Sequence, residues 1–307
     1  MRKNGEVSFG VKTTPMHNDY EDIRRVWLEA DGLPEIEHAW LWDHMLPLAG
    51  RKDGKIYEGW TLLAALAAQT ERLRLGLLVT SNRIRQPAVL GKIATTVDVV
   101  SHGRLVMGLG VGGTVQPPDT GGIAGENPAV AEYEAYGLTL VPPGEGIERL
   151  GETVTILKRM WTESVFDFEG KYYTLKNNRN EPKPVQAGGP PLLIGGWGRR
   201  TLGLVAEHAD IWNVPGPPHN TVEFVAERSR VLDERCAEIG RDPAEIARSV
   251  QIVISYDAPE AAREAALELI GAGINHVVLS LPRGYPEGVG RWLVDEIINP
   301  VRAELPD

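Results

Sequence analysis

The sequence predicts an α/β fold, a (β/α)8 TIM barrel formed by one domain. Short apolar, β-branched runs alternate with longer segments of helical period, which is typical of parallel strands joined by crossover helices. Eight such pairs can be counted along the 307 residues, and no linker or internal repeat divides them. Eight units can close into a barrel because the last strand then pairs with the first and leaves no edge. We therefore expect a single domain over residues 1–307.

The first four strands are justified by apolar runs at 7–11, 38–42, 73–79 and 104–109. The helix expected at 20–30 carries Ile23, Val26 and Trp27 at positions i, i+3 and i+4, so one face is apolar. A second helix is expected at 60–70, where Ala and Leu dominate. The third, at 87–100, begins with a proline in its first turn, as helix starts often do.

The regular alternation stops after the fourth strand. Residues 110–130 hold six glycines and three prolines without any period, and a connection of this length usually forms a lid or binding loop. We expect a lid insertion at 114–130. After a helix at 147–161, strands at 165–168 and 172–175 predict a hairpin within a second insertion, 162–190, and both insertions are expected at the face formed by the carboxyl ends of the strands. The last strands are expected at 192–195, 210–213, 250–255 and 276–279, with helices at 199–207, 221–239, 259–269 and 289–301.

The net charge of the chain limits the classes of molecule that we expect it to bind. Lys and Arg number 32 and Asp and Glu number 42, so the formal net charge is −10. Such a surface is repelled by phosphate backbones and anionic lipid, which argues against nucleic acid and membranes as partners. The sequence shows neither a secretory signal nor an apolar run of membrane-spanning length. We expect a cytoplasmic protein whose partner is a small-molecule substrate.

In a barrel of this kind the active site lies at the carboxyl ends of the strands. Asp43 and His44 follow the second strand. Histidine can exchange a proton near neutral pH, and an adjacent carboxylate can bias its protonation or bind a ligand N–H group. The alternative is that His44 caps a helix or faces solvent. No His, Asp or Glu set has the spacing of metal ligands, so no catalytic metal is expected.

A glycine-rich segment follows the fourth strand. Residues 108–113 match the dinucleotide pattern G-x-G-x-x-G, but that pattern must open a helix, and here it leads to Pro117 and Pro118. A nicotinamide site of the Rossmann type is therefore not expected. Gly110 and Gly112 are interpreted as residues that let the backbone approach a ligand, with a simple turn as the alternative.

A second glycine turn, at 195–198, leads into the helix expected at 199–207. Free backbone N–H groups and the positive end of a helix form an anion site, which Arg199 or Arg200 could reinforce. The alternative is an ordinary strand-to-helix turn. Trp42 and Trp212 flank strand ends and could form the walls of a site for an aromatic ligand.

Several sequence blocks, taken together and in order, resemble the bacterial luciferase-like monooxygenase superfamily. These blocks are LWDH at 41–44, TERLRLG at 70–76, RQPA at 85–88, TVDVVSHGR at 96–104, FEGKYY at 168–173, PKPVQ at 182–186 and IGG at 194–196. They cover nearly the whole chain. The WDH ending of the second strand, together with ADIWN at 209–213, is most similar to the branch that uses the 5-deazaflavin coenzyme F420 instead of FMN.

The resemblance implies that the deazaflavin lies across the barrel mouth with Asp43 and His44 close to its ring. It also implies a bulge at 77–80, often with a non-prolyl cis peptide bond, against the back of the ring. The implied cofactor-binding residues are Asp43, Leu78, Val79, Thr80, Asn82, Gly110, Gly112, Gly195, Gly196, Trp197, Gly198 and Trp212. Sugar-phosphate dehydrogenases of this branch place a catalytic Glu after the fourth-strand glycines, where this chain has Gly113, so sugar-phosphate oxidation is not expected.

The function expected from this resemblance is hydride transfer between C5 of F420 and a small organic substrate, with His44 exchanging the accompanying proton and residues 114–130 covering the site. One alternative is an FMN-dependent monooxygenase that receives reduced flavin from a separate reductase. Another is a non-catalytic flavin-binding relative. The family's usual assembly implies a homodimer.

Overall fold

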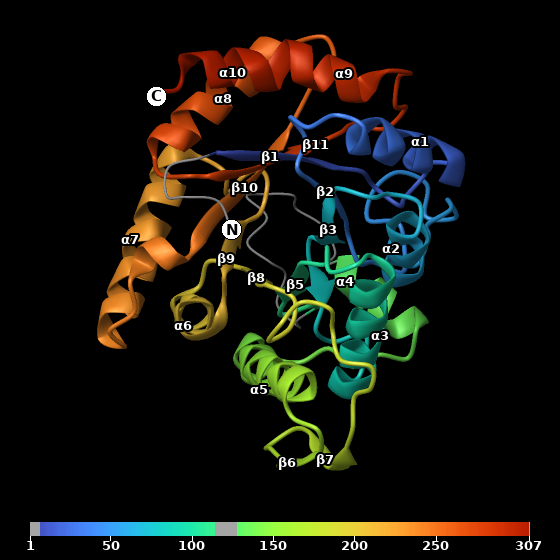
Figure 1. Cartoon of the computed structure of the whole chain (residues 1–307), viewed down its shortest axis with the longest axis vertical. Coiled ribbons are helices and arrows are strands. Elements are labelled where there is room, and N and C mark those ends of the chain that lie inside the picture. The colour runs from blue at the N-terminus through green and yellow to red at the C-terminus, as the bar shows by residue number, and fades with distance from the viewer. Residues whose placement is uncertain (1–6, 114–127, 307) are drawn as a thin grey trace.

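The computed structural model describes residues 7–113 and 128–306, so most of the expected lid at 114–130 lies outside the described residues (Figure 1). The described chain is an α/β barrel, as predicted. Its parallel sheet has the strand order β3-β2-β1-β11-β10-β9-β8-β5-β4. The strands are β1 (Ser8–Lys12), β2 (His38–Leu41), β3 (Arg74–Leu77), β4 (Thr80–Ser81), β5 (Met107–Gly110), β8 (Leu192–Gly195), β9 (Ile211–Val214), β10 (Ala247–Val253) and β11 (His276–Ser280).

The third predicted strand closes the barrel. It is divided into β3 and β4, which stand at the two ends of the strand order and count as one barrel strand. The N–H of Leu75 in β3 donates to the carbonyl of Arg104 at 3.1 Å, and the N–H of Val106 donates to the carbonyl of Leu75 at 2.8 Å. The strand thus pairs with β2 on one side and with the segment leading into β5 on the other. This arrangement confirms the predicted closed barrel of eight strands.

Helices cover the outside of the barrel (Figure 1). They are α1 (Tyr20–Asp31), α2 (Gly59–Ala67), α3 (Pro87–Val100), α4 (Pro128–Ala135), α5 (Pro143–Thr162), α6 (Arg199–His208), α7 (Val222–Glu238), α8 (Pro259–Gly271), α9 (Val289–Leu293) and α10 (Asn299–Glu304), with a 3₁₀ turn at Pro243–Glu245. Ile23, Val26 and Trp27 of α1 are fully buried, as their spacing predicted. Among the described helices, none combines the length and the apolar character that a membrane span requires.

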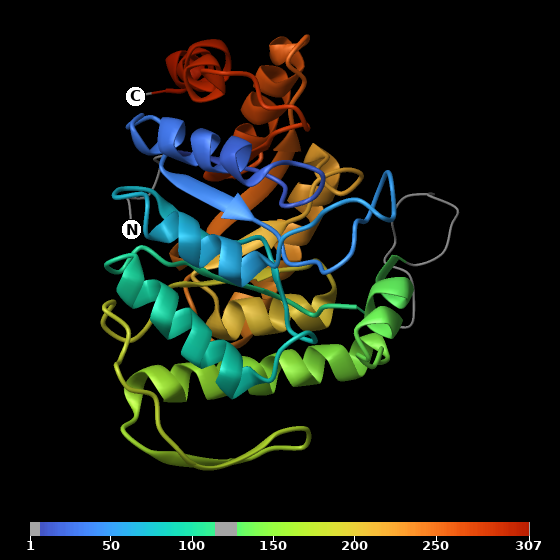
Figure 2. The same ribbon diagram turned by 90° about the vertical axis from the view of Figure 1, so that its right-hand side faces the viewer.

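Two predicted elements differ in detail. The helix expected at 289–301 is divided into α9, a π-helical turn at Val294–Ile298 and α10, because Pro300 has no N–H group to continue the hydrogen-bond pattern. The predicted hairpin is present as β6 (Phe166–Glu169) and β7 (Thr174–Asn178), which pair antiparallel. Figure 2 shows it along the outer side of α5.

Helix α4 was not predicted. The segment 110–130 was expected to lack regular structure, but α4 begins at Pro128 within it. Its sequence, PAVAEYEA, is short and has no apolar stripe that would mark a helix. Figure 2 shows α4 at the end of the barrel toward which the strands point. This helix therefore brings its side chains to the face where the active site was expected.

Candidate active site

A cavity of about 470 Å³ opens at the carboxyl ends of the strands. Its wall is formed by residues that follow β2, β3, β5, β8 and β9, by Gln251 within β10, and by the first turns of α5 and α6. This is the position that the barrel fold predicts for an active site. Of the described residues that line it, His44 is the one histidine, and none is a carboxylate. The cavity is therefore mainly apolar, with one proton-exchanging group.

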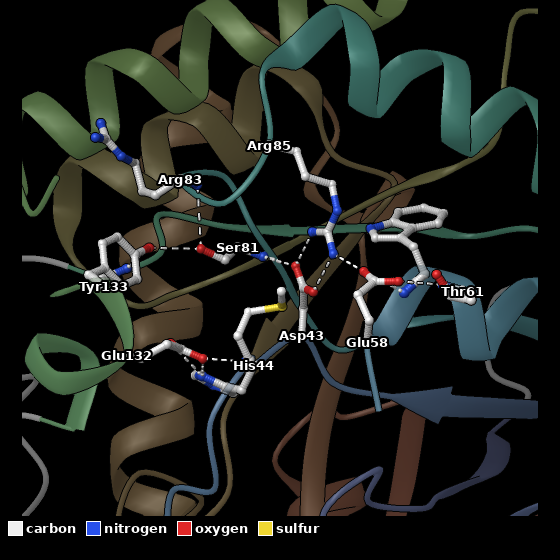
Figure 3. A network of polar contacts seen from close by, with 12 residues as sticks. Asp43, His44, Glu58, Thr61, Ser81, Arg83, Arg85, Glu132 and Tyr133 are labelled. Carbon is white, nitrogen blue, oxygen red and sulfur yellow. Dashed lines mark hydrogen bonds and ion pairs between the residues drawn. The ribbon is translucent and has the colours of Figure 1, made fainter. Parts of the chain in front are cut away.

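The imidazole of His44 is held by a carboxylate from α4. Nδ1 of His44 lies 3.1 Å from Oε2 and 3.3 Å from Oε1 of Glu132 (Figure 3). Because a carboxylate only accepts hydrogen bonds, Nδ1 is the donor, and Nε2 is the atom left to exchange a proton. The His44 side chain is 32% exposed, whereas that of Glu132 is 1% exposed. Glu132 is thus the buried residue that orients the pair, and His44 is the residue that reaches the cavity.

The buried carboxylate of Glu132 is fully engaged. It also accepts hydrogen bonds from the N–H groups of Met45 and Leu46, the latter at 3.4 Å. Burial alone would raise the pKa of Glu132, but the hydrogen bond and charge of His44 and the two backbone donors outweigh it, so the pKa lies below its usual value. Glu132 therefore remains ionised beside the imidazole. Sequence reasoning missed this residue because no periodic pattern indicated α4.

Helix α4 is fixed to the glycine turn that follows β5. The hydroxyl of Tyr133 accepts a hydrogen bond from the N–H of Gly113 at 2.8 Å and lies 3.0 Å from Oγ of Ser81 (Figure 3). At Gly112 the φ angle is +83°, and a Cβ there would lie 2.6 Å from Oγ of Ser81. Glycine is thus required for this turn to approach β4. These contacts determine where Glu132 lies.

Asp43 lies on the other side of the backbone from His44, as successive residues of extended chain do. Its carboxylate forms a bidentate ion pair with Arg85, at 2.7 and 3.0 Å, and accepts the N–H of Ser81 at 3.0 Å (Figure 3). Arg85 also pairs with Glu58, which caps the N-terminus of α2. The Asp43 side chain is fully buried and does not line the cavity. The carboxylate partner of His44 is therefore Glu132, and the expected pair of adjacent residues is not formed.

The end of the third strand forms the bulge that the resemblance implied. The peptide bond between Leu78 and Val79 is cis, and both residues line the cavity. A Cβ at Gly110 would lie 2.6 Å from Cγ2 of Val79, and one at Gly195 would lie 3.1 Å from its Cγ1. Both glycines therefore make room for the bulge itself. This explains them without the close ligand approach or the simple turn considered from the sequence.

Helix α6 points its N-terminus at the cavity. Its N-cap, Gly198, offers no side-chain hydrogen bond, so the first backbone N–H groups of the helix are available to an anion. Gly196 has a φ of +139°, which favours glycine, and its carbonyl accepts the indole N–H of Trp212 at 2.7 Å. Trp212 is fully buried, so it supports this turn and does not form a wall of the cavity as expected.

The two arginines at the start of α6 do not reinforce the anion site. Arg199 forms ion pairs with Glu234 and Glu238, both at 3.2 Å, and Arg200 pairs with Glu148 at 3.1 Å. Carboxylates on α7 and α5 thus draw both guanidinium groups away from the helix end. The expectation that Arg199 or Arg200 strengthens this site is wrong, and the backbone of the turn is what remains to hold an anion.

The structure brings most of the predicted site residues together. Those that line the cavity are His44, Leu78, Val79, Gly110, Gly112, Gly195, Gly196, Trp197 and Gly198. Asp43, Thr80, Asn82 and Trp212 lie behind it. Among the described residues, the indole N–H of Trp42, the amide of Asn82 and the hydroxyl of Thr80 are buried polar groups without a hydrogen-bond partner. Of these three residues Trp42 lines the cavity, and since buried polar groups are normally paired, its indole N–H fits the polar edge of a bound ring.

Comparison with known proteins agrees with this geometry. The family model described as luciferase-like monooxygenase matches residues 10–287. A pyrimidine monooxygenase RutA from Caulobacter vibrioides is 30% identical over 190 residues, which cover 60% of this chain and 48% of that protein. An F420-dependent glucose-6-phosphate dehydrogenase from Kineococcus radiotolerans is 27% identical over 242 residues, 76% of this chain and 62% of that protein. This chain therefore spans about half to three fifths of the length of these relatives.

Solved structures share the fold. An F420-dependent secondary alcohol dehydrogenase in complex with an F420–acetone adduct superposes with a TM-score of 0.80 at 18% identity, covering 97% of this chain and 99% of that one. A riboflavin lyase with modified FMN and riboflavin gives a TM-score of 0.77 at 14% identity, covering 97% and 92%. The match to the family model covers most of the chain, and the fold agrees with it. The chain belongs to the luciferase-like monooxygenase family of oxidoreductases.

Proposed function

We propose that this enzyme transfers a hydride between coenzyme F420 and a small organic substrate. The observation that carries the proposal is the His44–Glu132 pair, which presents one imidazole nitrogen to a cavity that has no carboxylate among its described lining residues. Such a site can move one proton through His44. Relatives named as F420-dependent support the choice of cofactor, although others are named as monooxygenases.

The residues present fit F420. When bound, the deazaflavin supplies a carbon that donates or accepts a hydride and does not readily form a peroxide with oxygen. Leu78 and Val79 would support the back of its ring, and the indole N–H of Trp42 would find an acceptor on a ring edge. The uncapped N-terminus of α6, after Gly198, would hold the phosphate. We infer these contacts from the chemistry of the lining residues.

His44 would exchange the proton that accompanies hydride transfer. In alcohol oxidation Nε2 accepts the hydroxyl proton, and in carbonyl reduction it returns one. Glu132 keeps Nδ1 protonated and stabilises the imidazolium ion by its buried negative charge. A positioned acid–base group of this kind contributes roughly 10²- to 10⁴-fold to the rate. Glu132 is thus a positioning residue, and His44 is the catalytic one.

The competing function is an FMN-dependent monooxygenase, which the 30% identity to a pyrimidine monooxygenase favours. Such an enzyme would receive reduced flavin from a reductase. The experiment that separates the two adds oxidised F420 or FMN to the purified full-length chain and follows cofactor fluorescence. The F420 proposal expects a dissociation constant for F420 at least about ten-fold lower than for FMN, a difference of about 1.4 kcal/mol. Equal or tighter binding of FMN would overturn it. Binding of neither would contradict both functions.

A further inference from the structure

A lysine lies inside the barrel mouth, where neither the sequence motifs nor the proposed proton transfer uses it. Lys12 is the last residue of β1 and is partly buried. Its ammonium donates a hydrogen bond to Oε1 of Gln251 and lies 5.9 Å from the centroid of the Trp42 ring. Both of these neighbours line the cavity. The charge of Lys12 is therefore directed to the cavity wall.

This cation has no counter-ion among the described residues. An ammonium carries three donors, and Gln251 accepts the one hydrogen bond that the Lys12 ammonium makes within the described chain. Burial lowers the pKa of Lys12 to about 8, which still leaves the group mostly charged at neutral pH. A buried cation is normally paired. The Lys12 ammonium has two further donors and a charge that no described residue neutralises. Both favour an anionic ligand as its partner.

Hydrogen bonds to residues of β9 and β10 orient the side-chain amide of Gln251, which binds Lys12. Nε2 of Gln251 donates to Oδ1 of Asn213 at 3.4 Å, and Nδ2 of Asn213 donates to Oγ of Ser249 at 2.9 Å. Ser249 in turn lies 2.8 Å from Nδ1 of His276, deeper in the barrel. This chain of neutral groups turns the Gln251 carbonyl toward Lys12. It orients the pair without neutralising the charge.

Gln251, which holds the Lys12 ammonium, is on a strand across the barrel from the bulge. In the strand order, β10, which carries Gln251, is four strands from β3 in one direction and four strands from β4 in the other. A ring supported by Leu78 and Val79 would therefore expose its opposite face toward Gln251 and Lys12. This step rests on the proposed function, because it assumes that the cofactor ring lies on Leu78 and Val79. The pair then lies where a substrate would bind.

We propose that Lys12 and Gln251 form a subsite for an anionic oxygen of the substrate, so that the enzyme acts on small organic carboxylates. The carboxylate would accept hydrogen bonds from the two free donors of the Lys12 ammonium. The remainder of the substrate would lie against Trp42 and the apolar residues of the cavity.

Benzoate and its neutral, nearly isosteric amide, benzamide, test this proposal by calorimetric titration of the cofactor-free, full-length chain. The wild-type protein is expected to bind benzoate about ten- to hundred-fold more tightly than benzamide, the worth of a charge-assisted hydrogen bond. Lys12→Met should lose this preference, and Lys12→Arg should keep most of it. Lys176→Met, on the exposed face of the β7 strand, removes the same charge outside the site and should bind as wild type does.

Two controls separate the subsite from a structural role and from the cofactor site. Thermal unfolding of Lys12→Met should occur at or above the wild-type temperature, because an unpaired buried charge is removed. Its affinity for F420 should equal that of the wild type. The proposal is overturned if wild type does not prefer benzoate, if Lys12→Met retains the preference, or if that variant loses F420 affinity instead. Because benzoate is titrated without cofactor, failure of wild type to bind F420 would contradict the proposed function alone.

Discussion

Asp43 and His44 are neighbours in the chain, yet the structure uses them in opposite ways. The oxygens of Asp43 are bound by Arg85 and by the Ser81 N–H group, and its side chain is fully buried. Within residues 7–113 and 128–306, His44 is bound at one ring nitrogen, by Glu132, and its side chain is 32% exposed. A polar group whose bonding capacity is filled by the protein stabilises the fold, whereas one with capacity left can act on a ligand. This difference supports the proposed role of His44 in proton exchange, and we expect Asp43 to act mainly on stability.

The largest expected effect is on turnover. His44→Ala removes the group that exchanges the proton, so kcat for hydride transfer should fall roughly 10²- to 10⁴-fold. Affinity for F420 should stay near wild type, whereas the free energy of unfolding should fall because the buried Glu132 carboxylate loses its side-chain partner. The change in F420 absorbance during turnover of an accepted substrate measures kcat. Unchanged turnover would remove His44 from the chemistry.

Asp43 should show the reverse pattern, with its main effect on stability. Asp43→Ala leaves Arg85 buried beside one fewer carboxylate, and breaking a buried pair in this way costs about 3–5 kcal/mol of unfolding free energy. Urea denaturation measures the loss. The matched control is Asp53→Ala at the exposed Arg51–Asp53 pair, which should cause no measurable change. If both variants unfold alike, the scaffold role of Asp43 is wrong.

Glu132 should show a smaller effect of both kinds. Glu132→Gln keeps a hydrogen-bond acceptor for Nδ1 of His44 but loses the charge, so kcat should fall roughly ten-fold while KM is retained. Glu132→Asp, which restores the charge, should recover part of the rate. A purely structural role would lower stability without separating kcat from KM in this way.

The same residue gives a pH dependence of stability. The folded-state pKa of Glu132 is depressed, so its contribution is present above the unfolded value near 4.3 and is lost as the pH falls through the folded value. Wild type should therefore exceed Glu132→Gln in unfolding free energy by about 1–2 kcal/mol at pH 7. The difference should shrink in acid. A difference that stays constant from pH 7 to pH 3 would contradict the assignment.

The barrel could be predicted from the sequence because its signals are local. Apolar runs of strand length predict the strands, and the spacing of Ile23, Val26 and Trp27 predicts the buried face of the first helix. The bulge at Leu78 and Val79 was reached through the family resemblance, since no local pattern specifies a cis peptide bond. The position of His44 at the cavity was predicted because the residues that follow a barrel strand lie at the active-site face.

The partners of the site residues could not be predicted in this way. Glu132 lies 88 residues from His44, on a short helix within a segment rich in glycine and proline. Asp43 and His44 could not be assigned different roles until the contacts of each were known. One signal was available for Lys12, because a charged residue at the end of a strand that is otherwise apolar points into the barrel mouth or away from it. Only the fold determines which.

The most direct test of the account is a crystal structure of the full-length chain with F420 bound. The account predicts the deazaflavin ring in the cavity, one face on Val79 and one edge beside His44, with the phosphate at the N-terminus of α6. The face toward Gln251 should remain open. A ring bound elsewhere on the protein, or a phosphate held away from α6, would contradict the proposed function.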